Sequence, residues 1–307
     1  MIRNQEGAAL VVTLLVVSIM TITVTEFLYA TWVDRSLTVN FSDTAKSSYA
    51  LRAGVEAGRA ILREDYREDA KRGLFADTLR DFWAQPALPI PIDDTYLFVS
   101  IADESSKIDL NRLITQGGYP DEKWINTFRR LLRDLGEDED IATYVLDWID
   151  ENSEGPAEDG YYQSSSLPYR CKNARLDSVE ELKRVRGITP AVFAKLRKFV
   201  TIRSAGWVNI NTAAAEVLMA LDDRISKGTA DAVIKARNEM PFKRKEDIKN
   251  VGGFEDIFPR IGSMIDVSSN SFSIAATITV GEVNRKAEAL VTERNAGGAT
   301  LLYYREY

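Results

Sequence analysis

The chain begins with the stretch "RNQEGAALVVTLLVVSIMTITVTEFLYATWV" (residues 3–33), and this stretch decides how the rest is interpreted. Residues 8–25 carry no charge, and as a helix they span about 27 Å, close to the ~30 Å hydrocarbon thickness of a bilayer. The many β-branched residues weaken a helix in water, but in lipid the backbone must satisfy its own hydrogen bonds. Tyr29 and Trp32 then suit a membrane interface. We therefore predict a transmembrane helix over residues 8–30.

The segment differs from an ordinary secretory signal, whose apolar region is shorter and precedes a small-residue cleavage site. Here the small residues Gly7 and Ala8 come before the apolar run, after a short polar leader (residues 1–7). This arrangement resembles the signal of type IV prepilins and pseudopilins, which prepilin peptidase cuts after the glycine before methylating the new amino terminus. The resemblance implies a cut between Gly7 and Ala8, with the helix kept as an anchor. A plain single-pass anchor is the alternative.

One residue departs from the usual pattern of that group. Most members carry a glutamate at the fifth mature position, where it neutralises the terminal amine of the neighbouring subunit, whereas this chain has Val12. A buried, unpaired charge costs several kcal/mol. A subunit with no neighbour ahead of it has no amine to pair, so valine suits the subunit at the tip of a filament. Stem packing is expected through Val12, Leu14 and Val17.

Composition limits the possible functions of the chain. The 307 residues are 45% hydrophobic and 28% charged, so a sizeable core can form, and the net charge of −7 gives no overall basic footprint for nucleic acid. There is no histidine and one cysteine, Cys171, which excludes histidine-based catalysis, an internal disulfide and an ordinary zinc site. Cys171 is interpreted as a lone thiol without a function. We expect a protein that is not an enzyme.

The two ends of the chain predict one α+β domain of pilin-like fold. Residues 31–106 read as a stem helix, amphipathic as far as residue 62, a proline-rich break at "QPALPIP" (85–91) and a strand at the start of "YLFVSIADESSKIDLN". Residues 267–307 read as an antiparallel meander, because alternating apolar segments are separated by short turns that contain glycine. A long N-terminal helix with an antiparallel sheet is the pilin plan.

Between these ends, residues 107–266 predict an inserted all-α domain with a weak internal repeat. "KIDLNRL" (107–113) echoes "WVNINTA" (207–213), and "DSVEELKRVRGIT" (177–189) echoes "KEDIKNVGGF" (245–254). Ser178 and Glu181 also form a capping box. A pilin with such an insertion, like a sterile-alpha-motif or helix-hairpin-helix domain, resembles the minor pseudopilin K family of type II secretion. The resemblance is carried by Gly7-Ala8, "KIDLN", "DWIDENSEGPAEDGYY", "PYRCKNARLDSVEELKRVRGIT" and "GWVNINTA".

This resemblance implies a function in assembly. It implies a subunit at the tip of the pseudopilus that initiates or caps the filament and supports protein export across the outer membrane. The implied partners are the minor pseudopilins of I and J type, prepilin peptidase and the bacterial inner membrane, with no nucleic acid. The implied location is a single pass through the inner membrane with a periplasmic C-terminal domain.

The acidic segment "DWIDENSEGPAEDGYY" (147–162) is a candidate metal site. Asp147 and Asp150 are three apart at a helix end, so they share a face, and further acids follow in a loop with glycine and proline. Oxygen ligands from a flexible loop suit Ca²⁺, although the spacing is not that of an EF-hand. Charge alone favours a solvated acidic loop. The resemblance implies calcium, bound by Asp147, Asp150, Asn152, Glu158 and Asp159, with aspartate usual in the family where Asn152 stands.

The basic segment "LKRVRGITPAVFAKLRKFVTIR" (182–203) supports an alternative function. It reads as helix, turn and helix with seven cations and no acid, as in hairpins that bind a DNA phosphate through backbone N–H groups. That interpretation gives a membrane-anchored DNA-uptake protein of competence systems. The turn at residues 187–189 lacks the second glycine of such hairpins, so a packing role with a solvated basic face is the other interpretation.

Overall fold

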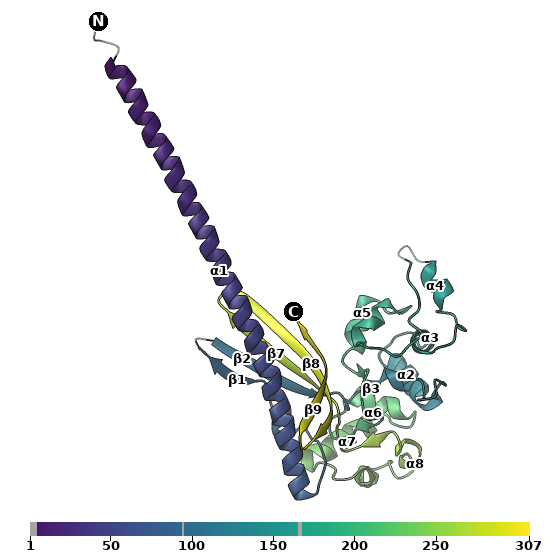
Figure 1. The fold of residues 1–307 in the computed structure, drawn as a ribbon. Helices are drawn as coiled ribbons and strands as arrows, with labels where there is room; N and C mark the ends of the chain where they lie inside the picture. The colour runs from purple at the N-terminus through teal and green to yellow at the C-terminus, as the bar shows by residue number, and fades with distance from the viewer. Residues whose placement is uncertain (1–4, 94, 165–167) are drawn as a thin grey trace.

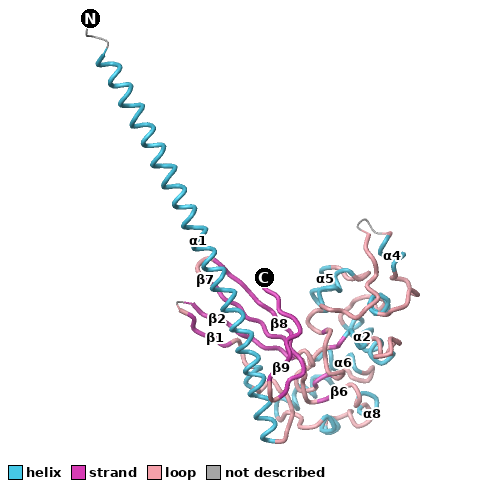
Figure 2. Tube along the Cα trace, in the orientation of Figure 1, coloured by secondary structure: helices cyan, strands magenta, loops and turns pink. Residues whose placement is uncertain are grey.

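The structure is a computed structural model that describes residues 5–93, 95–164 and 168–307. Its longest element is helix α1 (Gln5–Arg72), whose N-terminal half stands away from the rest of the molecule (Figures 1 and 2). Among the described residues α1 is the one helix long and apolar enough to cross a membrane. The predicted apolar helix is confirmed, and it continues ten residues past the predicted end at residue 62. Residues 1–4 of the predicted leader lie outside the described residues.

The C-terminal half of α1 packs against a sheet. Leu51, Val55 and Leu62 are buried there, at intervals that place them on one face of the helix. Gly58 allows a close approach, because a Cβ atom at this position would lie 2.7 Å from Cγ2 of Ile274 on the sheet. Burial of this stripe fixes the helix to the sheet through the hydrophobic effect, whereas the exposed N-terminal half has no such contact.

The sheet is antiparallel and has the strand order β1-β2-β7-β8-β9. Its strands are β1 (Leu88–Ile92), β2 (Thr95–Asp103), β7 (Phe272–Val280), β8 (Val283–Asn295) and β9 (Gly298–Glu306). Inward-facing residues of the middle strands alternate with more exposed ones and form one core with α1. The predicted α+β class and the C-terminal meander are confirmed.

Strand β1 occupies the place where we expected a proline-rich break. Pro89 pairs with Phe98 and Pro91 pairs with Tyr96 in register. Proline cannot donate a hydrogen bond to a ladder, so it is tolerated only where one side of the strand is free. The expectation failed because β1 is an edge strand, and the position at the edge is a property of the whole sheet.

An inserted domain separates β2 from β7, and its buried apolar residues form a core of their own. Its helices are α2 (Glu122–Asp134), α3 (Ile141–Ile149), α4 (Asp159–Gln163), α5 (Pro190–Leu196), α6 (Ala215–Leu221), α7 (Lys227–Glu239) and α8 (Phe258–Ile261). Two 3₁₀ helices cover residues 179–184 and 245–250. The expectation of an all-α domain needs one correction, because four two-residue strands are also present.

Those strands reveal a duplication. In the first half of the inserted domain (residues 108–201), β3 (Ile108–Asp109) pairs in parallel with β4 (Val200–Thr201). In the second half (residues 208–266), β5 (Val208–Asn209) pairs in parallel with β6 (Ile265–Asp266). Each pair joins the beginning of a half to its end, so each half is closed on itself. The predicted internal repeat is confirmed.

Side chains repeat the same bonds in both halves. The Asn111 side chain donates to the Leu176 carbonyl at 2.9 Å and accepts from the Leu176 N–H at 2.7 Å. Asn211 makes the same pair of bonds to Phe242, both at 2.9 Å. Each asparagine therefore fixes the chain three residues before the start of a 3₁₀ helix. These bonds satisfy backbone groups that would be costly to leave unpaired.

The 3₁₀ helices are capped in the same way. The Glu181 carboxylate accepts from the Ser178 N–H at 3.0 Å, and the Asp247 carboxylate accepts from the Arg244 N–H at 3.0 Å. The predicted capping box of Ser178 and Glu181 is confirmed. The two halves thus share a scaffold down to individual hydrogen bonds.

A buried polar junction holds the second half against the sheet. Oδ2 of Asp103, at the end of β2, accepts hydrogen bonds from the Thr212 hydroxyl at 2.5 Å and the Ser269 hydroxyl at 2.6 Å. Asn209 on β5 donates to the same oxygen at 3.3 Å. Because these groups are buried and partnered, they set the position of the inserted domain as well as stabilising it.

Candidate functional site

The start of α1 presents the residues expected for processing and stem packing. Gly7 and Ala8 lie in the exposed first turns of the helix, and a Cβ atom at Gly7 would meet nothing within 4 Å. Val12, Leu14 and Val17 are 60%, 64% and 56% exposed. So large an apolar surface is stable only in lipid or against other apolar helices. The structure therefore leaves this segment free for such contacts, and the roles of these residues stay predictions.

The acidic segment lies in an insertion that the second half lacks. In the second half, α7 ends at Glu239, and only residues 240 and 241 separate it from Phe242, which is bound by Asn211. In the first half, α3 ends at Ile149, and the matching Leu176 follows only after residues 150–175, which we call the insertion. In Figure 2 the described residues of the insertion are mostly loop around the short helix α4. The scaffold closes without such a loop, so the loop needs another explanation.

Three carboxylates of this region are buried. Asp147 on α3 and Asp150 at its C-cap are each 3% exposed, and Glu158 at the N-cap of α4 is 7% exposed. Oδ1 of Asp150 and both carboxylate oxygens of Glu158 have no hydrogen-bond partner. Burying a polar group without a partner is costly, and burying a charge costs more. The site therefore has oxygen atoms directed into the protein that nothing in the described chain satisfies.

Burial and neighbouring carboxylates raise the pKa values of Asp150 and Glu158. Burial raises the pKa of Asp150 to about 6, and the neighbouring Asp147 carboxylate adds to the effect. Burial likewise raises the pKa of Glu158 to about 7, with further contributions from the carboxylates of Asp147, Asp150 and Asp159. For Asp147, burial raises the pKa, while a hydrogen bond from the Ala157 N–H and the Arg186 charge oppose the rise. A divalent cation would favour the ionised form of each group.

The two other predicted ligands are placed differently. Oδ1 of Asp159 accepts from the Cys171 N–H at 2.7 Å, which leaves its second carboxylate oxygen available. Asn152 is exposed, and its side-chain oxygen accepts from the Glu154 N–H at 2.6 Å. Asp147, Asp150 and Asp159 thus lie near enough to Glu158 to raise its pKa, but no three of these four described carboxylates bring ligand oxygens within 4.8 Å of one another. Asn152 already has a partner within the loop.

Gly155 and Cys171 also shape the candidate site, although the sequence did not indicate either residue as part of it. A Cβ atom at Gly155 would lie 2.4 Å from Cγ of Asp147, so the loop passes this carboxylate only with a glycine. The Cys171 thiol, 3.4 Å from the Asp147 carbonyl, donates to it, and burial raises the pKa of Cys171 to about 11. Cys171 is therefore a neutral packing and positioning residue. The position of Gly155 within a run of acidic residues was the one feature of the sequence that could have indicated its steric role.

The donor set fits a hard cation. It consists of carboxylate oxygens from the end of one helix and the start of another, and three of these oxygens have no partner. Calcium accepts six to eight oxygen ligands in flexible geometry and tolerates the backbone carbonyls and water that complete such a loop site. Bound there, the ion would tie the end of α3 to the start of α4.

A second acidic cluster lies at the junction of α1 and the sheet. Carboxylate oxygens of Asp65, Asp69 and Asp77 lie within 4.8 Å of one another, close enough to hold a metal ion. Arg294 on β8 already provides a cation there, because its guanidinium lies 2.5 Å from the Asp65 carboxylate and 2.8 Å from that of Asp77. One guanidinium there pairs with three carboxylates, whereas the carboxylates of Asp147, Asp150, Glu158 and Asp159 form no ion pair within the described residues.

The basic segment 182–203 does not form an unobstructed cationic surface. Lys183 and Lys195 form ion pairs with acidic residues of the same domain. The Arg186 guanidinium lies 4.6 Å from the ring centroid of Tyr144 and 4.5 Å from that of Tyr161. These contacts give three of the seven cations a role within the fold and favour the packing interpretation.

Comparison with protein families divides the chain at the boundary between the two halves. Two family models, both described as "Type II secretion system (T2SS), protein K", match residues 106–205 and residues 208–268. Together they cover more than half of the chain.

Similar proteins extend the likeness over most of the chain. Type II secretion system protein K of Pectobacterium carotovorum subsp. carotovorum is 30% identical over 270 residues, which is 81% of this chain and 80% of that protein. The protein of the same description from Pseudomonas aeruginosa is 28% identical over 91% of this chain and 86% of its own length. The crystal structure of the GspK-GspI-GspJ complex from enterotoxigenic Escherichia coli contains a chain with a TM-score of 0.76 and 19% identity. This match covers 88% of this chain and 99% of that one.

Proposed function

Because this chain belongs to the protein K family of type II secretion systems, we propose that it is a minor pseudopilin that occupies the tip of the pseudopilus. There it would initiate or cap the filament and support protein export across the outer membrane. The observation that carries the proposal is the shape of α1. One end is exposed and apolar, and the other is built into a sheet that bears a large second domain. This division suits a protein that works by assembly rather than catalysis.

The stem gives the proposal its mechanism. Inserted in the bacterial inner membrane, α1 would hold the folded part in the periplasm until neighbouring stems replace lipid around Val12, Leu14 and Val17. Prepilin peptidase would first remove residues 1–7 and methylate Ala8. With valine rather than glutamate at position 12, the stem carries no carboxylate that needs a neighbour's amine in an apolar surrounding.

The placement of the inserted domain supports a position at the end of the filament. The inserted domain lies to one side of the sheet, beyond the axis of the stem (Figure 1). We propose that this bulk prevents another subunit from stacking above it. The solved relative comes from a complex of GspK with GspI and GspJ, so we propose minor pseudopilins of I and J type as the partners of this chain.

The proposed metal is calcium, bound by Asp147, Asp150, Glu158 and Asp159, with Asn152 as a further ligand. The support is the set of buried carboxylate oxygens without partners. Calcium would supply the positive charge that these carboxylates lack and would hold the insertion against the first half of the inserted domain. The chain's own part is to orient the oxygens: Ala157 and Cys171 each donate a backbone hydrogen bond to one carboxylate.

Processing is tested by the intact mass of the protein extracted from membranes of cells that contain the secretion system. The proposal predicts loss of Met1–Gly7 and gain of one methyl group. An uncut chain, or a chain cut after the apolar run, contradicts it.

Tip placement is tested by Val12→Glu with Val12→Leu as the matched control. The glutamate variant should reduce filament initiation at least tenfold, and the leucine variant should preserve it. Equal initiation by both variants contradicts the tip position.

A further inference from the structure

The two edges of the sheet are unlike. Strand β1 ends the sheet on one side and carries Pro89 and Pro91, which remove backbone donors and protect an edge from pairing. Strand β9 ends it on the other side, and its sequence "GATLLYYRE" contains no proline and no lysine. Leu301, Leu302 and Tyr303 on it are 39%, 39% and 37% exposed. The sheet is therefore blunted at one edge and open at the other.

The backbone of β9 offers unpaired groups beyond a bulge at Leu302. Tyr307 exchanges both backbone hydrogen bonds with Lys286 of β8, at 2.8 and 3.3 Å. Alternation along an antiparallel ladder then directs the N–H and C=O groups of Arg305 and Tyr303 toward β8, and those of Tyr304 and Glu306 outward. The outward groups are the template that an added strand needs.

This edge borders a groove. A groove of about 780 Å³ lies between β9 and the first half of the inserted domain, and Tyr303, Tyr304 and Arg305 all line it. Successive side chains of a strand point to opposite faces, so three consecutive residues can line one groove only along the edge. Trp148 and Tyr169 form part of the opposite wall. The groove thus combines a free strand edge with aromatic surface.

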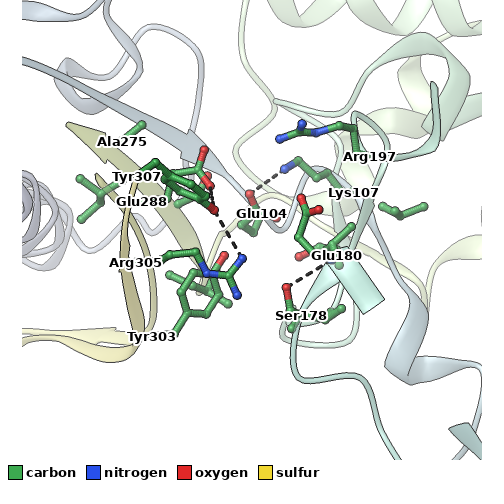
Figure 3. A pocket seen from close by; sticks show the side chains of 17 residues that line it. Glu104, Lys107, Ser178, Glu180, Arg197, Ala275, Glu288, Tyr303, Arg305 and Tyr307 are labelled. Carbon is green, nitrogen blue, oxygen red and sulfur yellow. Dashed lines mark hydrogen bonds and ion pairs between the residues drawn. The ribbon is translucent and has the colours of Figure 1, made fainter. Parts of the chain in front are cut away.

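The charges of the groove are not balanced. Four of its lining residues are basic and three, Asp177, Glu180 and Glu181, are acidic, so the lining has a net charge of +1. Lys172 pairs with both Asp177 and Glu181, and Lys183, which lies outside the lining, pairs with Glu180. Three arginines that line it, Arg170, Arg184 and Arg305, form no ion pair within the described chain and are exposed. Figure 3 shows Arg305 extending from β9 into the space that faces Glu180. The positive charge left over is complementary to an acidic ligand.

We propose that β9 and this groove bind an extended acidic segment of a partner protein, which adds to the sheet as a sixth strand beside β9. Backbone hydrogen bonds to Tyr304 and Glu306 would hold the segment, and Arg170, Arg184 and Arg305 would select carboxylates on it. The stretch from Tyr303 to Glu306 accommodates a strand of about four to five residues at ~3.3 Å per residue. The proposal does not depend on the calcium site or on the position in the filament.

The test uses the full-length protein in detergent and a fluorescein-labelled peptide of alternating glutamate and valine, with a lysine–valine peptide as the counterpart. Fluorescence anisotropy should show saturable binding of the glutamate peptide, at least tenfold tighter than that of the lysine peptide. Arg184→Glu combined with Arg305→Glu should weaken binding at least tenfold. The control variant Arg203→Glu, which changes the charge as much as either arginine substitution alone, should bind as the wild type does, because Arg203 is exposed but does not line the groove.

The backbone contribution is tested separately. Tyr304→Pro removes one outward N–H without removing a bond to β8, so it should lower the affinity for the glutamate peptide at least tenfold. Should that variant misfold, amide hydrogen exchange of the wild type gives the same information, because Tyr304 and Glu306 should exchange more slowly when the peptide is bound. Equal binding of both peptides, unchanged binding by the double arginine variant, or unaltered exchange at Tyr304 and Glu306 overturns the proposal.

Discussion

The first and second halves of the inserted domain share one scaffold and differ in one loop. Both have a parallel pair of short strands, an asparagine that fixes the chain before a 3₁₀ helix, and an acidic cap on that helix. The second half crosses from its long helix to the fixed point in two residues, whereas the first half inserts residues 150–175. Since the scaffold closes without the loop, the difference separates what folding needs from what function adds.

The insertion is nevertheless packed. Tyr162 is 1% exposed, and its ring lies edge-on to Trp148 with the centroids 5.1 Å apart. Its hydroxyl accepts a hydrogen bond from the Arg186 N–H at 3.2 Å. Tyr162 thus helps to attach the insertion to the rest of the first half, beside carboxylates that oppose its closure when no cation is bound. This balance of attraction and repulsion is what the predictions below test.

The largest effect is expected from Tyr162→Ala. Loss of a fully buried aromatic side chain should lower the free energy of unfolding by about 3–5 kcal/mol. Its neighbour Tyr161 is 43% exposed, so Tyr161→Ala should cost under about 1 kcal/mol, through the lost contact with Arg186. Denaturant unfolding followed by tryptophan fluorescence measures both values. Similar costs for the two variants would show that the insertion is not anchored at Tyr162.

A smaller and paired effect is expected from Asn111→Ala and Asn211→Ala. Each leaves a backbone N–H and a C=O of the inserted domain without a partner, which should cost about 1–3 kcal/mol in either half. The exposed Asn126 serves as the control, and Asn126→Ala should change stability by less than about 0.5 kcal/mol. Denaturant unfolding provides the comparison. If the substitution lowers stability in only one of the two halves, the matching hydrogen bonds do not contribute equally to the stability of the two halves.

The third prediction concerns the pH dependence of the stability of the calcium-free protein, to which only the first half contributes the carboxylates of the insertion. Folding raises the pKa of Asp150 from 3.8 to about 6 and that of Glu158 from 4.5 to about 7. The folded state then binds more protons than the unfolded state between about pH 4 and pH 7, so stability should fall as the pH rises through this window. The double variant Asp150→Asn with Glu158→Gln should remove this part of the slope and be more stable than the wild type at pH 8.

Thermal unfolding in chelator at several pH values provides that measurement. A slope will remain in the double variant, because other buried carboxyls also titrate, including Asp77, whose pKa burial raises to about 8. The contribution of the insertion is the difference between the two proteins. Identical slopes would mean that Asp150 and Glu158 do not oppose folding.

Gly155→Ala should have the smallest effect on the free energy of unfolding but a clear effect on the affinity for calcium. The new methyl group would displace the Asp147 carboxylate and should weaken calcium binding about tenfold. Gly160 is the matched control, because a Cβ atom there would meet nothing within 4 Å. Calcium titrations of the two variants should therefore differ. Unchanged affinity in Gly155→Ala would remove Asp147 from the set of ligands.

Much of the fold could be predicted from the sequence, because its signals are local. The length of the uncharged run predicted the apolar helix, and the alternation of apolar and polar residues predicted strands β7 to β9. The similar heptapeptides at 107–113 and 207–213 predicted the repeat. Strand β1 was missed because the prolines in it are acceptable only at a sheet edge, and no local pattern shows which strand is at the edge. The short strands β3 to β6 were missed because two residues carry no periodicity.

The candidate metal site was only partly predictable. The order and the type of the acidic residues are visible in the sequence, but a solvated acidic loop and a metal site have the same sequence pattern. The difference lies in the burial of Asp150 and Glu158 and in their unpartnered oxygens, which are tertiary properties. The steric need for Gly155 and the contacts of Cys171 with Asp147 and Asp159 likewise arise only when α3 and α4 are brought together.

The most direct test of the account is a calorimetric titration of calcium into the chelator-treated full-length protein, alongside the double variant Asp150→Asn with Glu158→Gln. The account predicts saturable binding with at least one ion per chain and a higher unfolding temperature for the wild type, and the loss of both in the variant. Absence of binding to the wild type, or equal binding by the two proteins, would contradict the claim that the insertion exists to hold a cation.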